Sequence, residues 1–123
     1  MKNNEALSPR PVFLNRLDAQ IEQHLSDPSL DLTKLLRSVG MSRTDLHRKL
    51  DRTTGMSATE YVRKKRLEKA VELLHEQPEW NIYQVALEVG FENHSYFTRR
   101  FREEFGRSPR EWQEQETGEE EFC

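Results

Sequence analysis

The chain contains the same pattern twice, about fifty residues apart, and this repeat restricts its possible folds more than any other feature. The match begins at a Val-Gly pair and continues through the apolar, glycine and serine positions that follow. The paired residues are Val39 with Val89, Gly40 with Gly90, Leu46 with Phe97, Leu50 with Phe101, Gly55 with Gly106, Ser57 with Ser108 and Tyr61 with Trp112. Two copies are too few for a solenoid. They predict two similar modules joined by a bridge.

Helix signals are dense along the chain, whereas strand signals are nearly absent. Apolar spacing and capping residues predict seven helices, and therefore an all-α fold with homeodomain-like repeats. The helices are expected at 12–26, 31–39, 42–54, 57–76, 81–88, 93–105 and from 108 onward. Expected N-caps are Asp31, Ser42 and Asn81, with reciprocal capping boxes between Ser57 and Glu60 and between Ser108 and Glu111. Gly40 and Gly90 are expected to end the short helices in left-handed conformation.

These signals divide the chain into five parts. They are a flexible leader at 1–11, a first lobe at 12–56, a linker helix at 57–76, a second lobe at 77–113 and an acidic, disordered tail at 114–123. Each lobe contains a short helix, a glycine turn and a longer helix. That order is typical of the helix-turn-helix motif.

The second helix of such a motif enters the major groove of duplex DNA, so the residues on its outward face must not be part of the hydrophobic core. In the second lobe, Phe97, Phe101 and Phe105 recur every four residues. At about 100° per residue they leave Ser95 and Arg99 on the opposite face.

The first lobe repeats this arrangement. Leu46 and Leu50 are expected to point inward, which leaves Thr44 and Arg48 outward. Arginine donates bidentately to guanine, and a small hydroxyl contacts bases or phosphate. The repeat therefore duplicates a candidate base-reading face as well as a hydrophobic frame.

The linker helix has a suitable length to hold both faces against one duplex. Twenty helical residues span roughly 30 Å, and successive major-groove segments on one side of B-DNA lie ~34 Å apart. The basic run Arg63-Lys64-Lys65-Arg66 is expected to meet phosphates. For Arg66, an internal pair with an acidic residue is an equal alternative.

The net charge of −3 does not exclude a nucleic-acid ligand. Residues 32–113 hold 16 Lys and Arg against 12 Asp and Glu, whereas residues 114–123 hold five acidic residues and no basic one. A local basic face decides such binding, and the whole-chain charge reports it poorly.

Other function classes lack support in the sequence. The four histidines are scattered, and no phosphate loop, Ser-His-Asp set or facing carboxylate pair occurs, so we expect no metal site, no cofactor and no enzyme. No apolar run approaches the ~20 residues of a membrane span. The single cysteine, Cys123, rules out an internal disulfide and fits the cytoplasm.

The most specific stretch is Asn81-Ile82-x-x-Val85-Ala86-x-x-Val89-Gly90-Phe91, followed by Ser95-Tyr96-Phe97, Phe101, Phe105-Gly106 and Ser108-Pro109. It resembles the C-terminal signature of the AraC/XylS transcription regulators, whose DNA-binding domain consists of two helix-turn-helix lobes on a long helix. The first lobe follows the pattern in Gly40-Met41-Ser42, Leu46, Gly55, Tyr61, Arg66-Leu67 and Ala70-x-x-Leu73-Leu74. The resemblance covers about residues 12–113.

The resemblance implies sequence-specific binding of double-stranded promoter DNA, with RNA polymerase as the eventual partner. It also implies that a sensor or receiver module is fused upstream. Carried over by position, the base-contacting residues are Thr44, His47, Arg48, His94, Ser95 and Arg99. The residues expected at phosphates are Ser42, Arg43, Arg63, Lys64, Lys65 and Arg102.

Two alternatives come from other classes. The chain could be a helical protein-interaction adaptor whose basic face meets an acidic partner. A small metal- or ligand-binding helical protein is the other, although the sequence offers no ligand set at suitable spacing. Separately, the alternative to base reading by Arg48 and Arg99 is an ordinary surface ion pair with Asp51 or Glu103.

Overall fold

The structure is a computed structural model that describes residues 10–30 and 32–114. Within these residues it contains seven helices and no strand, which confirms the expected all-α fold. They are α2 (Val12–Gln23), α3 (Leu32–Val39), α4 (Arg43–Thr54), α5 (Ala58–Glu76), α6 (Ile82–Glu88), α7 (His94–Phe105) and a last helix over 109–114. The predicted leader as far as residue 9, and the predicted tail from residue 115, lie outside the described residues. None of the described helices is long and apolar enough to cross a membrane.

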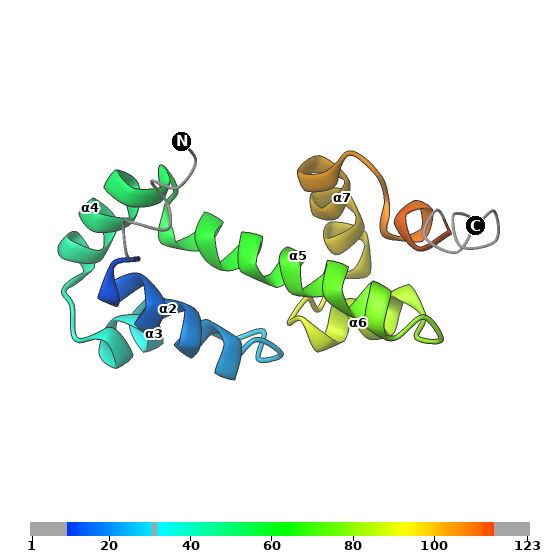
Figure 1. Cartoon of the computed structure of the whole chain (residues 1–123). Coiled ribbons are helices and arrows are strands. Elements are labelled where there is room, and N and C mark those ends of the chain that lie inside the picture. Colours follow the sequence, from blue (N-terminus) through cyan, green and yellow to red (C-terminus); the bar gives the residue numbers. More distant parts are fainter. Residues whose placement is uncertain (1–9, 31, 115–123) are drawn as a thin grey trace.

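The long helix α5 connects two groups of helices (Figure 1). We call α2, α3 and α4 the first lobe, and α6, α7 and the helix at 109–114 the second lobe. The helices that pack closely on each other either belong to the same lobe or include α5. With 19 residues, α5 is about 28 Å long.

Side-chain caps begin the helices where the sequence predicts them. In α5 the Glu60 N–H donates to Ser57 Oγ at 3.1 Å, and the Ser57 N–H donates to Glu60 Oε1 at 2.9 Å. Ser108 and Glu111 form the same reciprocal pair. An unpredicted capping box joins Asn81 and Gln84, with both bonds 2.8 Å long. The Asp31 cap lies outside the described residues.

The helices also end close to their predicted limits. Gly40 and Gly90, with φ of 68° and 88°, adopt the left-handed conformation expected after the short helices, as do Gly55 and Gly106 after α4 and α7. One limit was wrong: α2 ends at Gln23, three residues early, and a turn occupies 24–26. The His24 N–H is shared between the carbonyls of Gln20 and Ile21, which tightens the last turn before Pro28.

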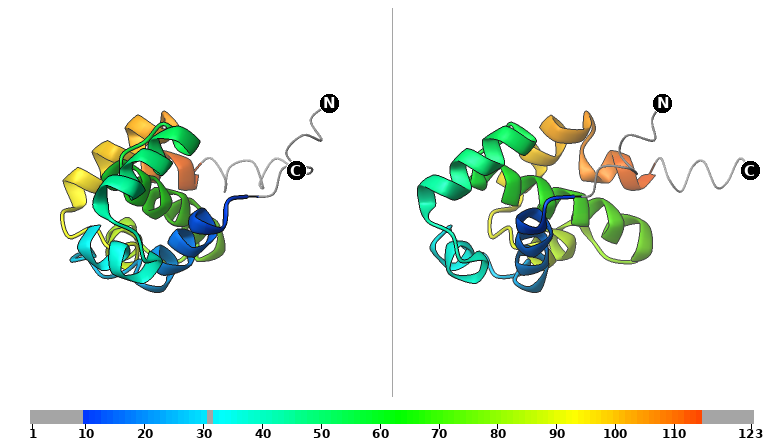
Figure 2. Two further views of the ribbon diagram at one scale, coloured as in Figure 1. Left: turned by 90° about the vertical axis from the view of Figure 1, so that its left-hand side faces the viewer. Right: turned by 60° about the vertical axis from the view of Figure 1, so that its left-hand side comes forward.

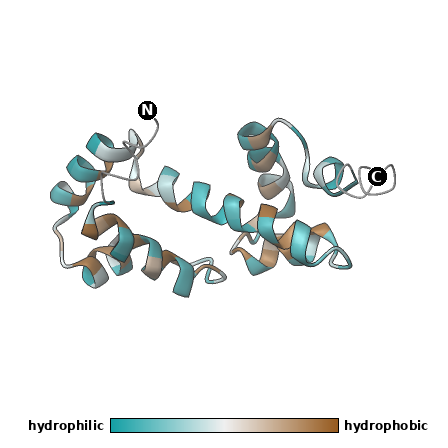
Figure 3. Cartoon of the chain, viewed as in Figure 1, coloured by the Kyte–Doolittle hydropathy of each residue, from teal (hydrophilic) through white to brown (hydrophobic). Residues whose placement is uncertain are grey.

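One hydrophobic cluster runs through both lobes and α5. Its fully buried members include Leu46 and Leu50 of α4, and Phe97 and Phe101 of α7. In the second lobe the aromatic rings contact one another at tilted angles, with 5.8 Å and 56° between the rings of Phe97 and Phe101. The inward position expected for Phe97 and Phe101 is therefore confirmed. In Figure 3 much of the ribbon of α4 and α7 is coloured as hydrophilic, whereas hydrophobic stretches recur along α2 and α6.

The start of α5 is fixed to α2 by a polar network. The Tyr61 hydroxyl donates to Asp18 Oδ1 at 2.5 Å. Arg10 donates to Asp18 Oδ2 at 2.6 Å, and Lys65 forms an ion pair with the same carboxylate at 3.7 Å. Burial raises the pKa of Tyr61 to about 12, and the bond to Asp18 acts in the same direction.

The centre of α5 carries a buried arginine. Arg66 is 6% exposed and donates to the backbone carbonyls of Leu25, Asp27 and Val89 at 2.9, 3.0 and 2.9 Å. Both earlier interpretations of this residue, a phosphate contact and a pair with an acidic side chain, were therefore wrong. The backbone at the ends of α2 and α6 occupies the positions where a partner side chain would lie.

The network at Tyr61 should contribute stability that is lost at alkaline pH. Because the folded-state pKa is raised above 10.0, the phenol proton is held more tightly in the folded protein. That contribution is complete below pH 10 and is lost as pH rises toward 12. Urea unfolding below pH 10 and again near pH 12 measures this contribution. Between these pH values the free energy of unfolding of the wild type should fall by up to about 2 kcal/mol more than that of Tyr61→Phe. Equal losses would show that these contacts do not favour the phenol.

Candidate nucleic-acid interface

The second helices of the two lobes lie on the same side of α5, with α4 at the start of α5 and α7 beside its middle (Figures 1 and 2). α4 follows the Gly40 turn, and α7 follows the Gly90 turn. α2 lies on the other side of α5. The predicted reading helices are therefore presented together, as binding to one flank of a duplex requires.

The outward face of α4 carries the three residues expected to contact bases. Thr44, His47 and Arg48 are exposed, whereas Leu46 and Leu50 on the other side have no exposed surface. Arg48 Nη1 lies 3.8 Å from Asp45 Oδ1, so its carboxylate neighbour is Asp45 and not Asp51. An ion pair this long and exposed holds the side chain weakly.

The outward face of α7 carries the matching set. His94, Ser95 and Arg99 are exposed, and together with Thr98 and Arg102 they line one shallow surface depression. Folding thus brings these five side chains together. At its first turn the face is supported by Asn93, whose side chain accepts from the Tyr96 N–H at 2.8 Å.

The charges around α7 leave Arg99 directed toward a ring and not a carboxylate. Glu103 accepts from Arg100 Nη1 at 3.0 Å, so the expected alternative pair between Arg99 and Glu103 is not the one formed. The Arg99 guanidinium carbon lies 5.4 Å from the Tyr96 ring centroid. Burial raises the pKa of Tyr96, but the neighbouring Arg100 and Arg63 outweigh it and lower that pKa below 10.0.

The residues expected at phosphates fall into two groups. Ser42, Arg43 and Arg102 are exposed at the edges of the reading helices. Ser42 also caps α4, because its Oγ accepts from the Asp45 N–H. The second group, Arg63, Lys64 and Lys65 in the N-terminal half of α5, has partners within the protein.

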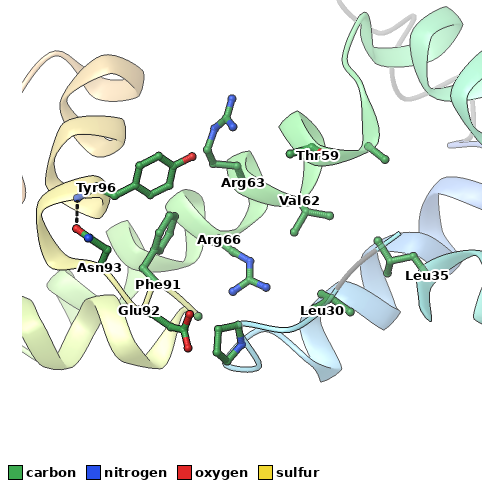
Figure 4. Close-up of a pocket in the computed structure, with 13 residues that line it drawn as sticks. Leu30, Leu35, Thr59, Val62, Arg63, Arg66, Phe91, Glu92, Asn93 and Tyr96 are labelled. Carbon is green, nitrogen blue, oxygen red and sulfur yellow. Dashed lines mark hydrogen bonds between the residues drawn. The ribbon is translucent and has the colours of Figure 1, made fainter. Parts of the chain in front are cut away.

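Lys64 and Lys65 form ion pairs with opposite lobes. Lys64 Nζ lies 3.8 Å from Glu104 of α7, and Lys65 Nζ lies 3.7 Å from Asp18 of α2. Arg63 is half-buried and faces Tyr96 at the mouth of a cleft (Figure 4). Contact with phosphate would compete with these pairs, each worth at most about 1 kcal/mol.

The sequence left the position of Arg66 open between phosphate and the interior, although a signal for burial was present. Arg66, Ala70 and Leu74 recur every four residues, which places the arginine on the apolar stripe of α5. Among the described residues, no group of three or more His, Cys, Asp or Glu side chains is placed to hold a metal ion.

Comparison with known proteins agrees with this geometry. A family described as a helix-turn-helix domain matches residues 35–115. The transcriptional activator RhaS of Escherichia fergusonii is 34% identical over 98 residues, which cover 80% of this chain. The chain belongs to the AraC/XylS family of DNA-binding transcription regulators. It spans 34% of the length of RhaS.

Solved structures give the same result. The C-terminal domain of AraT, a response regulator from Geobacillus stearothermophilus, superposes with a TM-score of 0.76 and is 29% identical. The match covers 88% of each chain. The DNA-binding domain of AdpA, solved in complex with a target DNA, has a TM-score of 0.71 and 26% identity. That match covers 81% of this chain and 88% of the AdpA chain.

The exposed reading residues should be removable without harm to the fold. Arg48→Ala and Arg99→Ala should each change the free energy of unfolding by less than about 1 kcal/mol, because each loses only surface contacts. Phe97→Ala, which empties a fully buried site, should cost roughly 3–5 kcal/mol. Urea unfolding measures all three. A large loss in either arginine variant would assign that arginine a structural role.

Proposed function

We propose that the chain binds promoter DNA with α4 and α7 in successive major-groove segments. The observation that carries this proposal is the shared orientation of two exposed, hydrogen-bonding faces, on α4 and on α7, on one side of α5. Adjacent segments of the major groove lie ~34 Å apart. The likeness to AdpA, whose DNA-binding domain was solved in complex with a target DNA, supports DNA as the ligand.

The side chains divide by role. Arg48 and Arg99 would donate bidentately to guanine, and Thr44 and Ser95 would contact bases or nearby phosphates. His47 and His94 lie on the same exposed faces and complete the base-reading set. These contacts supply sequence preference, because only base edges in the groove distinguish one sequence from another.

The phosphate contacts would come first from residues at the rim of each reading face. Arg43 begins α4, and its exposed charge adds to the partial positive charge of that helix end. Arg102 lies one turn beyond Arg99. The basic side chains of α5 would also contribute, once phosphate replaces the present partners of Arg63, Lys64 and Lys65. Contacts of this kind add affinity that does not depend on the DNA sequence.

The proposal extends to the rest of the regulator. RhaS is a transcriptional activator, and the AraT domain belongs to a response regulator. We accordingly propose that the chain acts as the output domain behind a sensor or receiver module, and that it brings RNA polymerase to a promoter. This role places it in the cytoplasm, where promoter DNA is accessible.

Selection of binding sites from random duplexes tests the proposal directly. The enriched sequences should contain two short conserved segments about one helical turn apart, and footprinting should protect both. An adaptor for an acidic protein would enrich no sequence and would leave no two-part footprint. Either of those results would overturn the proposal.

Loss of Arg99 should relax specificity at one place. Arg99→Ala is expected to cost ~1–3 kcal/mol at a single base position of the selected duplex, while preferences elsewhere persist. Competition binding against duplexes substituted one base at a time measures this. An unchanged base preference would remove Arg99 from the reading set.

Loss of Arg43 should have the contrasting effect. Arg43→Ala should weaken binding to all duplexes alike and reduce the slope of log K against log salt by about one. Arg16→Ala is the matched control, because it removes an equal charge from the exposed surface of α2. Affinities over a series of salt concentrations decide the matter. An equal change in both variants would show only a general charge effect.

A further inference from the structure

Arg66 is placed where the two lobes and the linker helix meet. Its Nη1 donates to Leu25 of the first lobe and to Val89 of the second, both at 2.9 Å. Its Nη2 donates to Asp27 at 3.0 Å. A guanidinium group holds its N–H donors in one rigid plane, so three carbonyl oxygens that it binds together are fixed relative to one another.

The carbonyls it binds lie at the ends of two helices. Leu25 and Asp27 follow the last turn of α2, and Val89 is the C-cap of α6. Carbonyls at helix C-termini have no partner within the helix and carry partial negative charge. The Asp27 oxygen also accepts from the Leu30 N–H at 3.1 Å. The buried cation is the side-chain donor to one carbonyl in each lobe, Leu25 and Val89, which explains how a charge persists at this depth.

Within the described part of the chain, few other contacts hold the two lobes together around Arg66. A cleft of about 350 Å³ separates the lobes beside Arg66 (Figure 4). It is lined by Leu30 and Leu35 from one lobe, Val62 from α5, and Phe91 and Tyr96 from the other lobe. Because the lobes do not fill this space, contacts around Arg66 decide much of the angle between them.

Gly90 makes room for this arrangement. A Cβ atom at position 90 would lie 1.4 Å from Arg66 Nη1 and 2.4 Å from the Leu25 carbonyl oxygen. At the equivalent Gly40, with φ of 68°, a Cβ would meet nothing within 4 Å. The two turns share the same left-handed backbone, but only the second admits an arginine and the backbone of the other lobe.

We propose that Arg66, with Gly90, is a positioning device that fixes the relative placement of α4 and α7. It thereby sets the spacing in base pairs between the two DNA segments that the chain reads. This inference rests on the proposed function. The device acts on geometry, so its removal should affect the coupling between the lobes and not the reading by either lobe alone.

The first test needs no DNA. Spin labels at Arg52→Cys of α4 and Glu103→Cys of α7, both exposed, with Cys123→Ser, report the distance between the reading helices. The distance distribution should broaden or shift in Arg66→Met and in Gly90→Ala. Gly40→Ala is the matched control, since it imposes the same left-handed strain without touching Arg66, and its distribution should stay as narrow as the parent's.

The second test uses the selected duplex, a half-site duplex and a duplex with one inserted base pair, which moves one segment by about 3.4 Å. The parent should bind the full site on the order of 10²-fold more tightly than the half-site, because the rigid connection makes the second contact intramolecular. One inserted base pair should abolish that gain. In Arg66→Met and Gly90→Ala the gain should fall to about tenfold and depend little on spacing, at unchanged half-site affinity.

Thermal unfolding confirms that each variant is folded before it is compared. If Gly40→Ala and Gly90→Ala change the distances equally, or if neither changes them, the proposed positioning role is wrong. If Gly90→Ala alone broadens the distribution but the parent binds no duplex, the device exists and the proposed function fails. Loss of half-site affinity in Gly90→Ala would assign Gly90 to reading within its own lobe and overturn the inference.

Discussion

The structure depends on one helix that supplies core to two lobes. Each lobe has roughly 40 residues, a size at which a chain rarely buries enough apolar surface alone. α5 supplies the missing surface through Leu67, Ala70 and Leu74, and the resulting hydrophobic cluster is continuous from the first lobe to the second. The reading helices are consequently parts of one body. Their exposed faces remain available for recognition because the opposite faces carry the packing.

A buried arginine in the middle of this core needs a physical explanation. An apolar side chain there would remove the cost of desolvating a charge, but it would take away the side-chain donor that the carbonyl oxygens of Leu25 and Val89 share. The burial that lowers the pKa of Arg66 is opposed by the nearby Asp27 carboxylate, and the charge is kept at the ends of two helices. Directional hydrogen bonds specify an orientation, whereas hydrophobic contact is non-directional. The arginine therefore contributes geometry where the apolar cluster contributes cohesion.

The sequence predicted the features that depend on near neighbours. Capping boxes and glycine turns involve residues three to five apart, and the outward placement of Arg48 and Arg99 follows from the helical period. The partners of Arg66 lie 23 to 41 residues away, so local patterns did not identify them. Lys64 and Lys65 were expected at phosphates, and their pairs with Glu104 and Asp18 cross between helices, so local patterns did not identify them either. The base contacts stay predictions, since a duplex, and not the fold, decides them.

The two glycine turns make the halves of the repeat unequal despite their similar sequences. Position 40 opens onto free space, so another residue that tolerates left-handed backbone, such as asparagine, has room there. Position 90 is closed by the guanidinium group and by backbone from the first lobe. The halves are therefore not interchangeable building blocks. A chimera built from two first halves could retain both reading faces, yet it would lack the closely packed turn at Gly90 through which Arg66 joins the lobes.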